Sequence, residues 1–261
     1  MGIGHVVRTK RASLVLALLA GIGVAPSFYA QHEAHDPGMD QTMLVPPDSP
    51  VETSVETRDT LKEEADKRFS EFNHRFAGVF VLLVGAVAFL QPYLAGRFAV
   101  IRYLWTFLFF VPGFYLLIFS DPESWPVGNQ TLHYVITENM QVLQHKIFSL
   151  VLLALSAVEY FRVRGKLRAL WTAFLFPAFA GAGAALLFFH SPQAHAAGMD
   201  VAAHQAMMGI QNQHAQFGLV GFGIAISKAI ADTERFHPRW MRMIFAALML
   251  FLGMLLITYT E

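Results

Sequence analysis

Six apolar segments, each about as long as a bilayer is thick, dominate this sequence and restrict the folds open to it. They lie at residues 75–94, 99–119, 143–161, 168–189, 213–231 and 239–258. About 20 residues of helix span the hydrocarbon core, and within lipid only helices and closed barrels satisfy their backbone hydrogen bonds. The 261-residue chain is 55% hydrophobic and 15% charged, unlike most soluble domains. We therefore predict an all-α polytopic membrane protein with six transmembrane helices.

The residues ahead of the first span have the pattern of an export signal followed by a linker. Residues 1–30 combine basic residues with an apolar run from Ala12 to Val24, as in a secretory signal peptide or an uncleaved anchor. Residues 31–57 are polar and lack periodicity, which predicts a flexible periplasmic linker. We place the six-helix membrane domain at 58–261, beginning with an amphipathic helix over 58–73.

The distribution of Lys and Arg predicts the orientation of the spans. The long connections at 120–142 and 190–212 contain neither residue type, whereas the short turns between spans are basic. The basic residues in or beside these turns are Arg97, Arg102, Arg162, Arg164, Lys166, Arg168, Lys228, Arg235, Arg239 and Arg242. Because short basic loops stay in the cytoplasm, we expect a bacterial-type inner membrane protein with its N-terminus and both long connections in the periplasm.

Three segments of the chain align without gaps and indicate an internal repeat. They are NHRFAGVFVLLVGA (73–86), QHKIFSLVLLALSA (144–157) and QHAQFGLVGFGIAI (213–226). Each begins with an amide residue and a His, and small residues follow that His by four and eleven positions. RYLWTFLFF (102–110) and RALWTAFLF (168–176), in the second spans, also match. We predict three tandem helical hairpins, at approximately 70–122, 141–192 and 210–261.

The repeat spacing places each His and its small residues on one helix face. Small residues allow membrane helices to approach closely, so we expect the first helices of the three hairpins to pack together around a pseudo-threefold axis. The side chains of His74, His145 and His214 would then meet in one layer near the periplasmic surface. The alternative is that each His caps a helix or forms a hydrogen bond at the membrane interface.

Further His and Met residues stand on the periplasmic side of the spans. The segment FHSPQAHAAGMDVAAHQAMMGIQNQH (189–214) adds the candidate metal ligands His190, His195, His204, Met207 and Met208. A possible secondary set comprises His133 and Met140, ahead of His145, and His32 and His35 in the linker. Imidazole and thioether ligands together suit copper, whereas zinc gains little from methionine. Without cysteine, the chain has no thiolate ligand. A Met stripe is also common in ordinary helix packing.

Two charged residues lie within the apolar spans. Glu159 and Lys228 each follow the His of their repeat by fourteen positions, so repeat symmetry places them at the same depth, near the cytoplasmic side. We predict a possible intramembrane ion pair. Alternatively, Lys228 extends to the interface and Glu159 faces headgroups.

The His-headed helices NHRFAG, QHKIFS and QHAQFG and the His/Met-rich exported connection resemble the copper-resistance D type of polytopic membrane protein. The resemblance covers only these short segments, and members of that family have more spans. It implies a copper role for His74, His145 and His214 and for the ligands at 190–208.

Three functions are compatible with this pattern. The first is copper binding in tolerance, delivery or uptake, with a periplasmic metal carrier or a membrane oxidase assembly partner. The second is a haem b or quinone-linked redox protein, because two imidazoles from facing helices can hold a haem. The third is a structural or assembly factor without a metal. A net charge of zero gives no basic field for nucleic acid, and no catalytic motif predicts an enzyme class.

Overall fold

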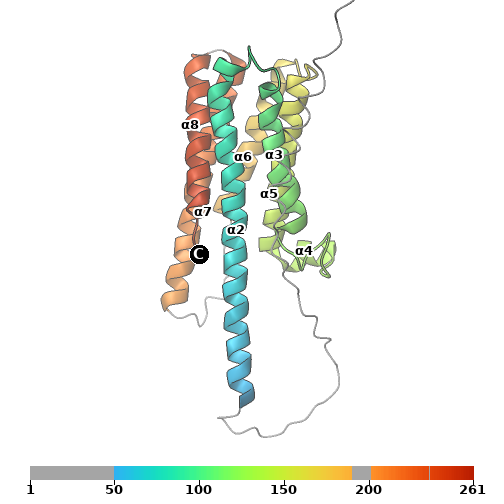
Figure 1. Cartoon of the computed structure of the whole chain (residues 1–261), viewed down its shortest axis with the longest axis vertical. Coiled ribbons are helices and arrows are strands. Elements are labelled where there is room, and N and C mark those ends of the chain that lie inside the picture. Colours follow the sequence, from blue (N-terminus) through green and yellow to red (C-terminus); the bar gives the residue numbers. More distant parts are fainter. Residues whose placement is uncertain (1–49, 190–200, 235) are drawn as a thin grey trace, which may run out of the picture. The chain divides into compact units, whose positions relative to one another are not determined.

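The computed structural model describes residues 50–189, 201–234 and 236–261, and every regular element in these ranges is helical (Figure 1). The elements are α2 (Pro50–Leu94), α3 (Ile101–Phe119), α4 (Leu132–Glu138), α5 (Met140–Val163), η1 (Leu170–Phe174), α6 (Leu175–Phe188), α7 (Val201–Thr233) and α8 (Pro238–Ile257). Within the described ranges, six helical segments are long and apolar enough to cross a membrane. For the described residues, the prediction of a helical fold with six helices able to span a membrane is therefore confirmed. Residues 1–30 and 31–49 lie outside the described residues.

Helix α2 is longer than the sequence pattern predicts. It begins at Pro50 and continues unbroken to Leu94, so residues 50–57 are its first turns and not part of a linker. Between Val51 and Gln91 the chain contains no proline. Ion pairs one turn apart, such as Arg68 with Glu64, further support the helix outside the apolar span.

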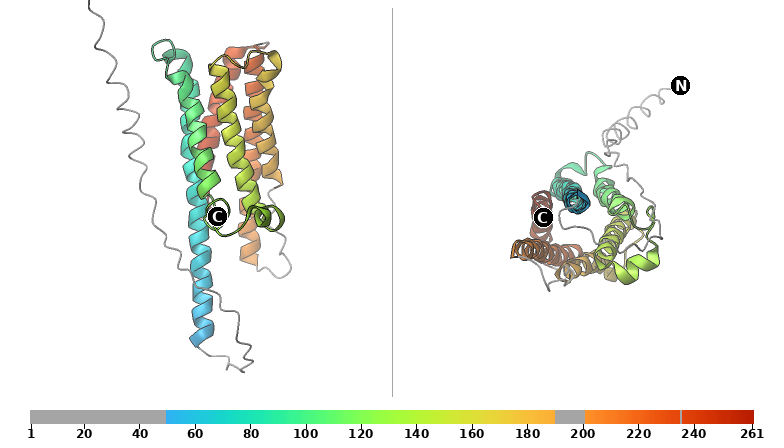
Figure 2. Two further views of the ribbon diagram at one scale, coloured as in Figure 1. Left: turned by 90° about the vertical axis from the view of Figure 1, so that its right-hand side faces the viewer. Right: turned by 90° about the horizontal axis from the view of Figure 1, so that it is seen from below.

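The spanning helices form a closed ring. Going around it, α2 packs on α3, α3 on α5, α5 on α6, α6 on α7, α7 on α8, and α8 on α2 (Figure 2). The interior is filled by buried apolar side chains from all parts of the ring, including Val84, Phe109, Leu155, Phe176, Ile224 and Met249. Exposed apolar side chains, including Phe107, Phe110, Phe114, Leu219 and Phe251, are numerous on the helices. A large exposed apolar surface is suited to lipid rather than water, as expected of a membrane protein.

The two ends of the ring differ in chemistry. The three short basic turns lie together at one end, at the top of Figure 1. Helix α4, the first turns of α7 and the residues after α8 lie toward the other end. The His-headed starts of the hairpins belong to this second end, because α2, α5 and α7 all run from it toward the basic turns.

Small residues bring neighbouring helices of the ring into close contact. A Cβ atom added to Gly78 would lie 2.8 Å from Leu256 Cβ on α8, and one added to Gly85 would lie 2.7 Å from Leu250 N on the same helix. Gly218 on α7 faces α6 in the same manner. On α5, Ser156 Oγ donates a hydrogen bond to Thr106 O on α3, at 2.8 Å. Each first helix therefore packs on the second helix of a neighbouring hairpin.

This arrangement corrects the prediction that the first helices pack together. Among the described residues, α2, α5 and α7 make no backbone contact with one another. Positions four and eleven residues after the His are rotated from it by about 40° and 20° around the helix. The small residues lie against the adjacent helix, while the longer imidazole side chains reach one another across the ring.

Replacing Gly253 on α8 with Ala should weaken the closure of the ring. The added Cβ would lie 2.6 Å from Leu82 Cβ and Leu82 N on α2, so the two backbones must separate. Such overpacking costs about 1–3 kcal/mol, which outweighs the gain of about 1 kcal/mol in helix propensity. We expect a lower midpoint of thermal unfolding in detergent for Gly253→Ala.

The matched control for this substitution is Gly209→Ala on α7. No atom lies within 4 Å of a Cβ built at Gly209, so this variant should unfold at the wild-type midpoint or slightly above it. Equal midpoints for Gly253→Ala and the wild type would contradict the close packing of α2 on α8.

Candidate functional site

The side chains of His74, His145 and His214 meet inside the ring. The imidazole of His74 on α2 lies 6.2 Å from that of His145 on α5 and 5.6 Å from that of His214 on α7, measured between ring centroids. Both contacts are edge-to-face. His214 is buried and the other two rings are half-buried. The structure therefore brings together the three histidines that the repeat spacing singled out, although their helices are separated by others in the ring.

Backbone hydrogen bonds orient two of the three imidazoles. His74 Nδ1 lies 2.9 Å from Ser70 O, and His214 Nδ1 lies 2.8 Å from Ile210 O, one turn earlier in each helix. A carbonyl oxygen can only accept, so Nδ1 carries the hydrogen. In a neutral imidazole, Nε2 then has the acceptor lone pair. Metal-binding histidines are commonly held by this type of bond from the other ring nitrogen.

The amide residue ahead of each His has a separate role. Asn73 Nδ2 donates to Ser120 O at 3.3 Å, Gln144 Nε2 to Phe189 O at 3.1 Å, and Gln213 Nε2 to Thr260 O at 2.7 Å. In all three cases the acceptor lies at or just beyond the C-terminal end of the second helix of the same hairpin. The last carbonyls of a helix lack partners within it, and an unsatisfied carbonyl in a membrane is costly. The amides satisfy these carbonyls.

Tyr259 is a member of the His cluster that sequence reasoning missed. Its ring stacks on His74 with centroids 3.9 Å apart and also makes an edge contact with His214. The side chain is fully buried, and its hydroxyl donates to Glu261 Oε1 at 2.8 Å. Burial, followed by the charge of Glu261, raises the pKa of the Tyr259 hydroxyl, so the phenol keeps its proton. Tyr259 lies outside the segments that align between the predicted repeats, and thus no pattern in the sequence indicated it.

The other predicted ligands are not part of this cluster. His204, Met207 and Met208 precede His214 by six to ten residues in one continuous helix, which corresponds to about 9–15 Å along its axis. They are too far along α7 to bind the same ion as His214. His133 on α4 and Met140 at the start of α5 are exposed. His32, His35, His190 and His195 lie outside the described residues.

The imidazole of His74 contacts those of His145 and His214, but the three rings are not arranged as ligands around a metal ion. Over residues 50–189, 201–234 and 236–261, no three His, Asp or Glu side chains converge as they would around a metal ion. Two imidazoles that share an ion through bonds of about 2.0–2.1 Å have centroids roughly 5–6 Å apart. The spacing of His74 from its two neighbours is close to this range.

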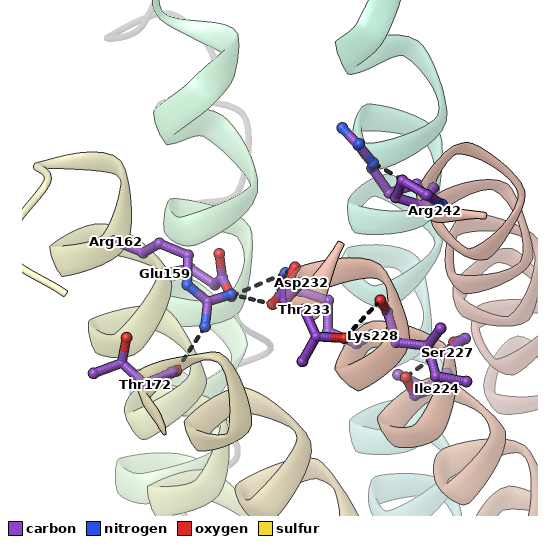
Figure 3. Close-up of polar contacts among 11 residues, drawn as sticks. Glu159, Arg162, Thr172, Ile224, Ser227, Lys228, Asp232, Thr233 and Arg242 are labelled. Atoms are coloured by element: carbon purple, nitrogen blue, oxygen red, sulfur yellow. Dashed lines mark hydrogen bonds and ion pairs between the residues drawn. The ribbon is translucent and has the colours of Figure 1, made fainter. Parts of the chain in front are cut away.

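A charged cluster occupies the opposite end of the ring interior (Figure 3). Lys228 Nζ lies 3.3 Å from Glu159 Oε1 and 2.7 Å from Asp232 Oδ2. Arg162 pairs with Asp232 and, at 2.9 Å, with Glu159, and it also donates to Thr172 O. The structure thus brings Glu159 and Lys228 together, and it adds Arg162 and Asp232, which sequence reasoning did not connect with them. The cluster contains two positive and two negative side chains.

Three aromatic rings surround the ammonium group of Lys228. Nζ lies 5.1 Å from the ring centroid of Trp105 on α3, 5.4 Å from that of Phe176 on α6, and 5.7 Å from that of Phe245 on α8. Cation–π attraction of this kind is strongest where the cation is desolvated. The Lys228 side chain therefore links α7 to α5 through charge and to three further helices through aromatic contacts.

Removing the Lys228 charge should destabilise the protein strongly. In Lys228→Met, Glu159 and Asp232 keep a single cationic partner in a buried setting, and breaking a buried ion pair costs about 3–5 kcal/mol. The double variant Lys228→Met/Glu159→Gln restores charge balance and should recover part of this loss. The measurement is the free energy of unfolding in mixed micelles.

The control for the charge cluster is Arg68→Met. Arg68 pairs with Glu64 on the exposed surface of α2, where an ion pair contributes about 1 kcal/mol or less. A double variant as unstable as Lys228→Met alone would contradict the charge-balance explanation.

Comparison of the chain with protein-family models, with curated protein sequences and with solved structures finds no match. The resemblance to copper-resistance D proteins therefore stays a prediction.

Proposed function

We propose that this chain is an inner-membrane copper-binding protein whose site is formed by His74, His145 and His214. The observation that carries the proposal is the contact of three imidazoles within the ring, at the end opposite the basic turns. Two of the rings have Nδ1 bound to a carbonyl, which directs Nε2 to ligand binding. We further propose that the three hairpins are copies of one unit, because the same amide-to-carbonyl bond recurs in each.

The hydrogen bonds of the amide residues favour a metal site at the three histidines over the alternative that each His caps a helix. If the histidines were present to cap helices, they would contact the free carbonyls at the ends of α3, α6 and α8. Asn73, Gln144 and Gln213 bind carbonyls at those ends instead. The imidazoles contact one another instead, and ionisable side chains gathered inside a membrane protein commonly mark a functional site.

The ligand types favour copper over other metals. Imidazole nitrogen binds both oxidation states of copper, and thioether sulfur favours Cu(I). His204, Met207 and Met208 extend outward from the cluster along α7, and we propose that they capture copper before it reaches the three histidines. An outward-facing capture segment suits exchange with a periplasmic metal carrier or delivery to an assembling membrane oxidase.

The position of the basic turns supports a periplasmic site. Short loops rich in Lys and Arg stay in the cytoplasm, and these turns lie at the end of the ring away from the His cluster (Figure 1). The three histidines are then at the periplasmic end of the spans.

A haem b site is the weaker proposal for the same residues. Bis-imidazole haem ligation needs a macrocycle between the two rings. His74 is in direct contact with both other imidazoles, and Tyr259 stacks on it, so a porphyrin would have to displace these contacts. No described contact favours a quinone.

Removing the three imidazoles should abolish copper binding. Wild-type protein purified from copper-supplemented cells should contain about one copper per chain, and His74→Ala/His145→Ala/His214→Ala should contain at least about tenfold less. Single His→Gln variants, checked for folding by size-exclusion chromatography, distinguish lost ligands from a lost fold. The measurement is elemental analysis with a visible spectrum.

The control for copper content is His133→Ala/His237→Ala, because both residues are exposed. Its copper content should equal that of the wild type. Unchanged copper in the triple variant, or a Soret band in the wild type, would contradict the proposed copper site.

Changing the proposed capture residues on α7 should slow the loading of copper without changing the amount of copper that the protein binds. In His204→Ala/Met207→Leu/Met208→Leu, the three-histidine site is intact, because the changed residues lie about 9–15 Å from His214. We expect several-fold slower transfer of Cu(I) from a chromophoric chelator, with the final copper per chain unchanged. Loss of stoichiometry would instead make these side chains ligands of the same ion.

A further inference from the structure

We infer that Tyr259 and Glu261 are positioning residues of the His cluster and that, with Ser70, they form a clamp around His74. The inference rests on the proposed function, because the clamp prepares His74 to bind a metal. His74 contacts both other imidazoles of the cluster. The orientation of its ring therefore affects both of these contacts.

The clamp is a closed circuit of contacts. His74 Nδ1 donates to Ser70 O at 2.9 Å, and the hydroxyl of Ser70 donates to Glu261 Oε1. The same carboxylate oxygen accepts a hydrogen bond from the Tyr259 hydroxyl at 2.8 Å. The Tyr259 ring returns to His74 as a stack with an interplanar angle of 22°. The bond to Ser70 O thus holds one edge of the His74 imidazole, and the Tyr259 ring holds one face.

Further hydrogen bonds dock residues 259–261 onto the helices that carry the site. The Glu261 N–H donates to Glu71 Oε1 on α2 at 3.3 Å. Gln213 on α7 donates to Thr260 O at 2.7 Å and accepts from the Thr260 N–H at 3.3 Å. The segment is therefore bound to the helix heads of both His74 and His214. Movement of the clamp would change the relative position of these two rings.

These contacts favour a positioning role over simple packing. An apolar side chain of similar size would fill the space beside His74 equally well. Tyr259 instead directs its hydroxyl to a carboxylate that also binds Ser70, whose carbonyl fixes the tautomer of His74. Outer groups that fix the tautomer and orientation of a ligand typically affect metal affinity 10–100-fold.

The first test measures the His74 tautomer without any metal. Nitrogen-15 NMR of histidine-labelled protein in bilayers, with His74 assigned by difference from His74→Gln, should show a single Nδ1–H tautomer in the wild type. Tyr259→Leu and Glu261→Gln should each give a mixture of tautomers. Tyr259→Phe keeps the stack and loses only the hydroxyl, so it should lie between the wild type and Tyr259→Leu.

The second test measures Cu(I) affinity by competition with a chromophoric chelator. We expect Tyr259→Leu and Glu261→Gln to bind copper about 10–100-fold more weakly, with Tyr259→Phe affected less. The matched controls are Tyr93→Leu and Glu64→Gln, both at exposed positions, and both should keep the wild-type affinity.

The two tests separate failure of the clamp from failure of the copper site. Wild-type tautomer and affinity in both Tyr259→Leu and Glu261→Gln would overturn the clamp. A wild type without copper whose His74 tautomer still responds to Tyr259→Leu would support the clamp and overturn the proposed function.

Discussion

Close contact between α2 and α8, where Gly78 lies against Gly253, joins the first and last spanning helices and closes the ring. The rest of the structure depends on this closure. It turns His74 toward the interior, where His145 and His214 also lie, and it places the residues after α8 beside the head of α2. Tyr259 can stack on His74 only because α8 ends at that level.

The ring has a polar layer at each end and an apolar interior between them. At the basic end, Glu159, Asp232, Arg162 and Lys228 satisfy one another, as a balanced set of charges in a membrane must. At the other end, the amides donate to carbonyls at or just beyond helix ends, and His74 contacts the other two imidazoles.

Much of the fold could be predicted because length and apolarity determine where helices cross a membrane. The nearly equal spacing of His74, His145 and His214, which are 71 and 69 residues apart, also predicted their convergence. The prediction that the small residues join α2, α5 and α7 was wrong. A sequence shows which face of a helix carries small residues, but not which neighbouring helix packs on that face. Residues 50–57 were assigned to a linker because their polarity hid their helical pattern. Tyr259 and Asp232 lie outside the segments that align between the predicted repeats, so only tertiary contacts could associate them with the two polar layers.

The most direct test of the three-histidine site is X-ray absorption at the copper edge of the purified, copper-loaded protein. The proposed site predicts a first shell of nitrogen at about 2.0 Å, with the multiple-scattering pattern of two to three imidazoles. Loss of that pattern in the variant lacking His74, His145 and His214 would complete the assignment. A first shell dominated by sulfur, or by oxygen without imidazole scattering, would contradict it.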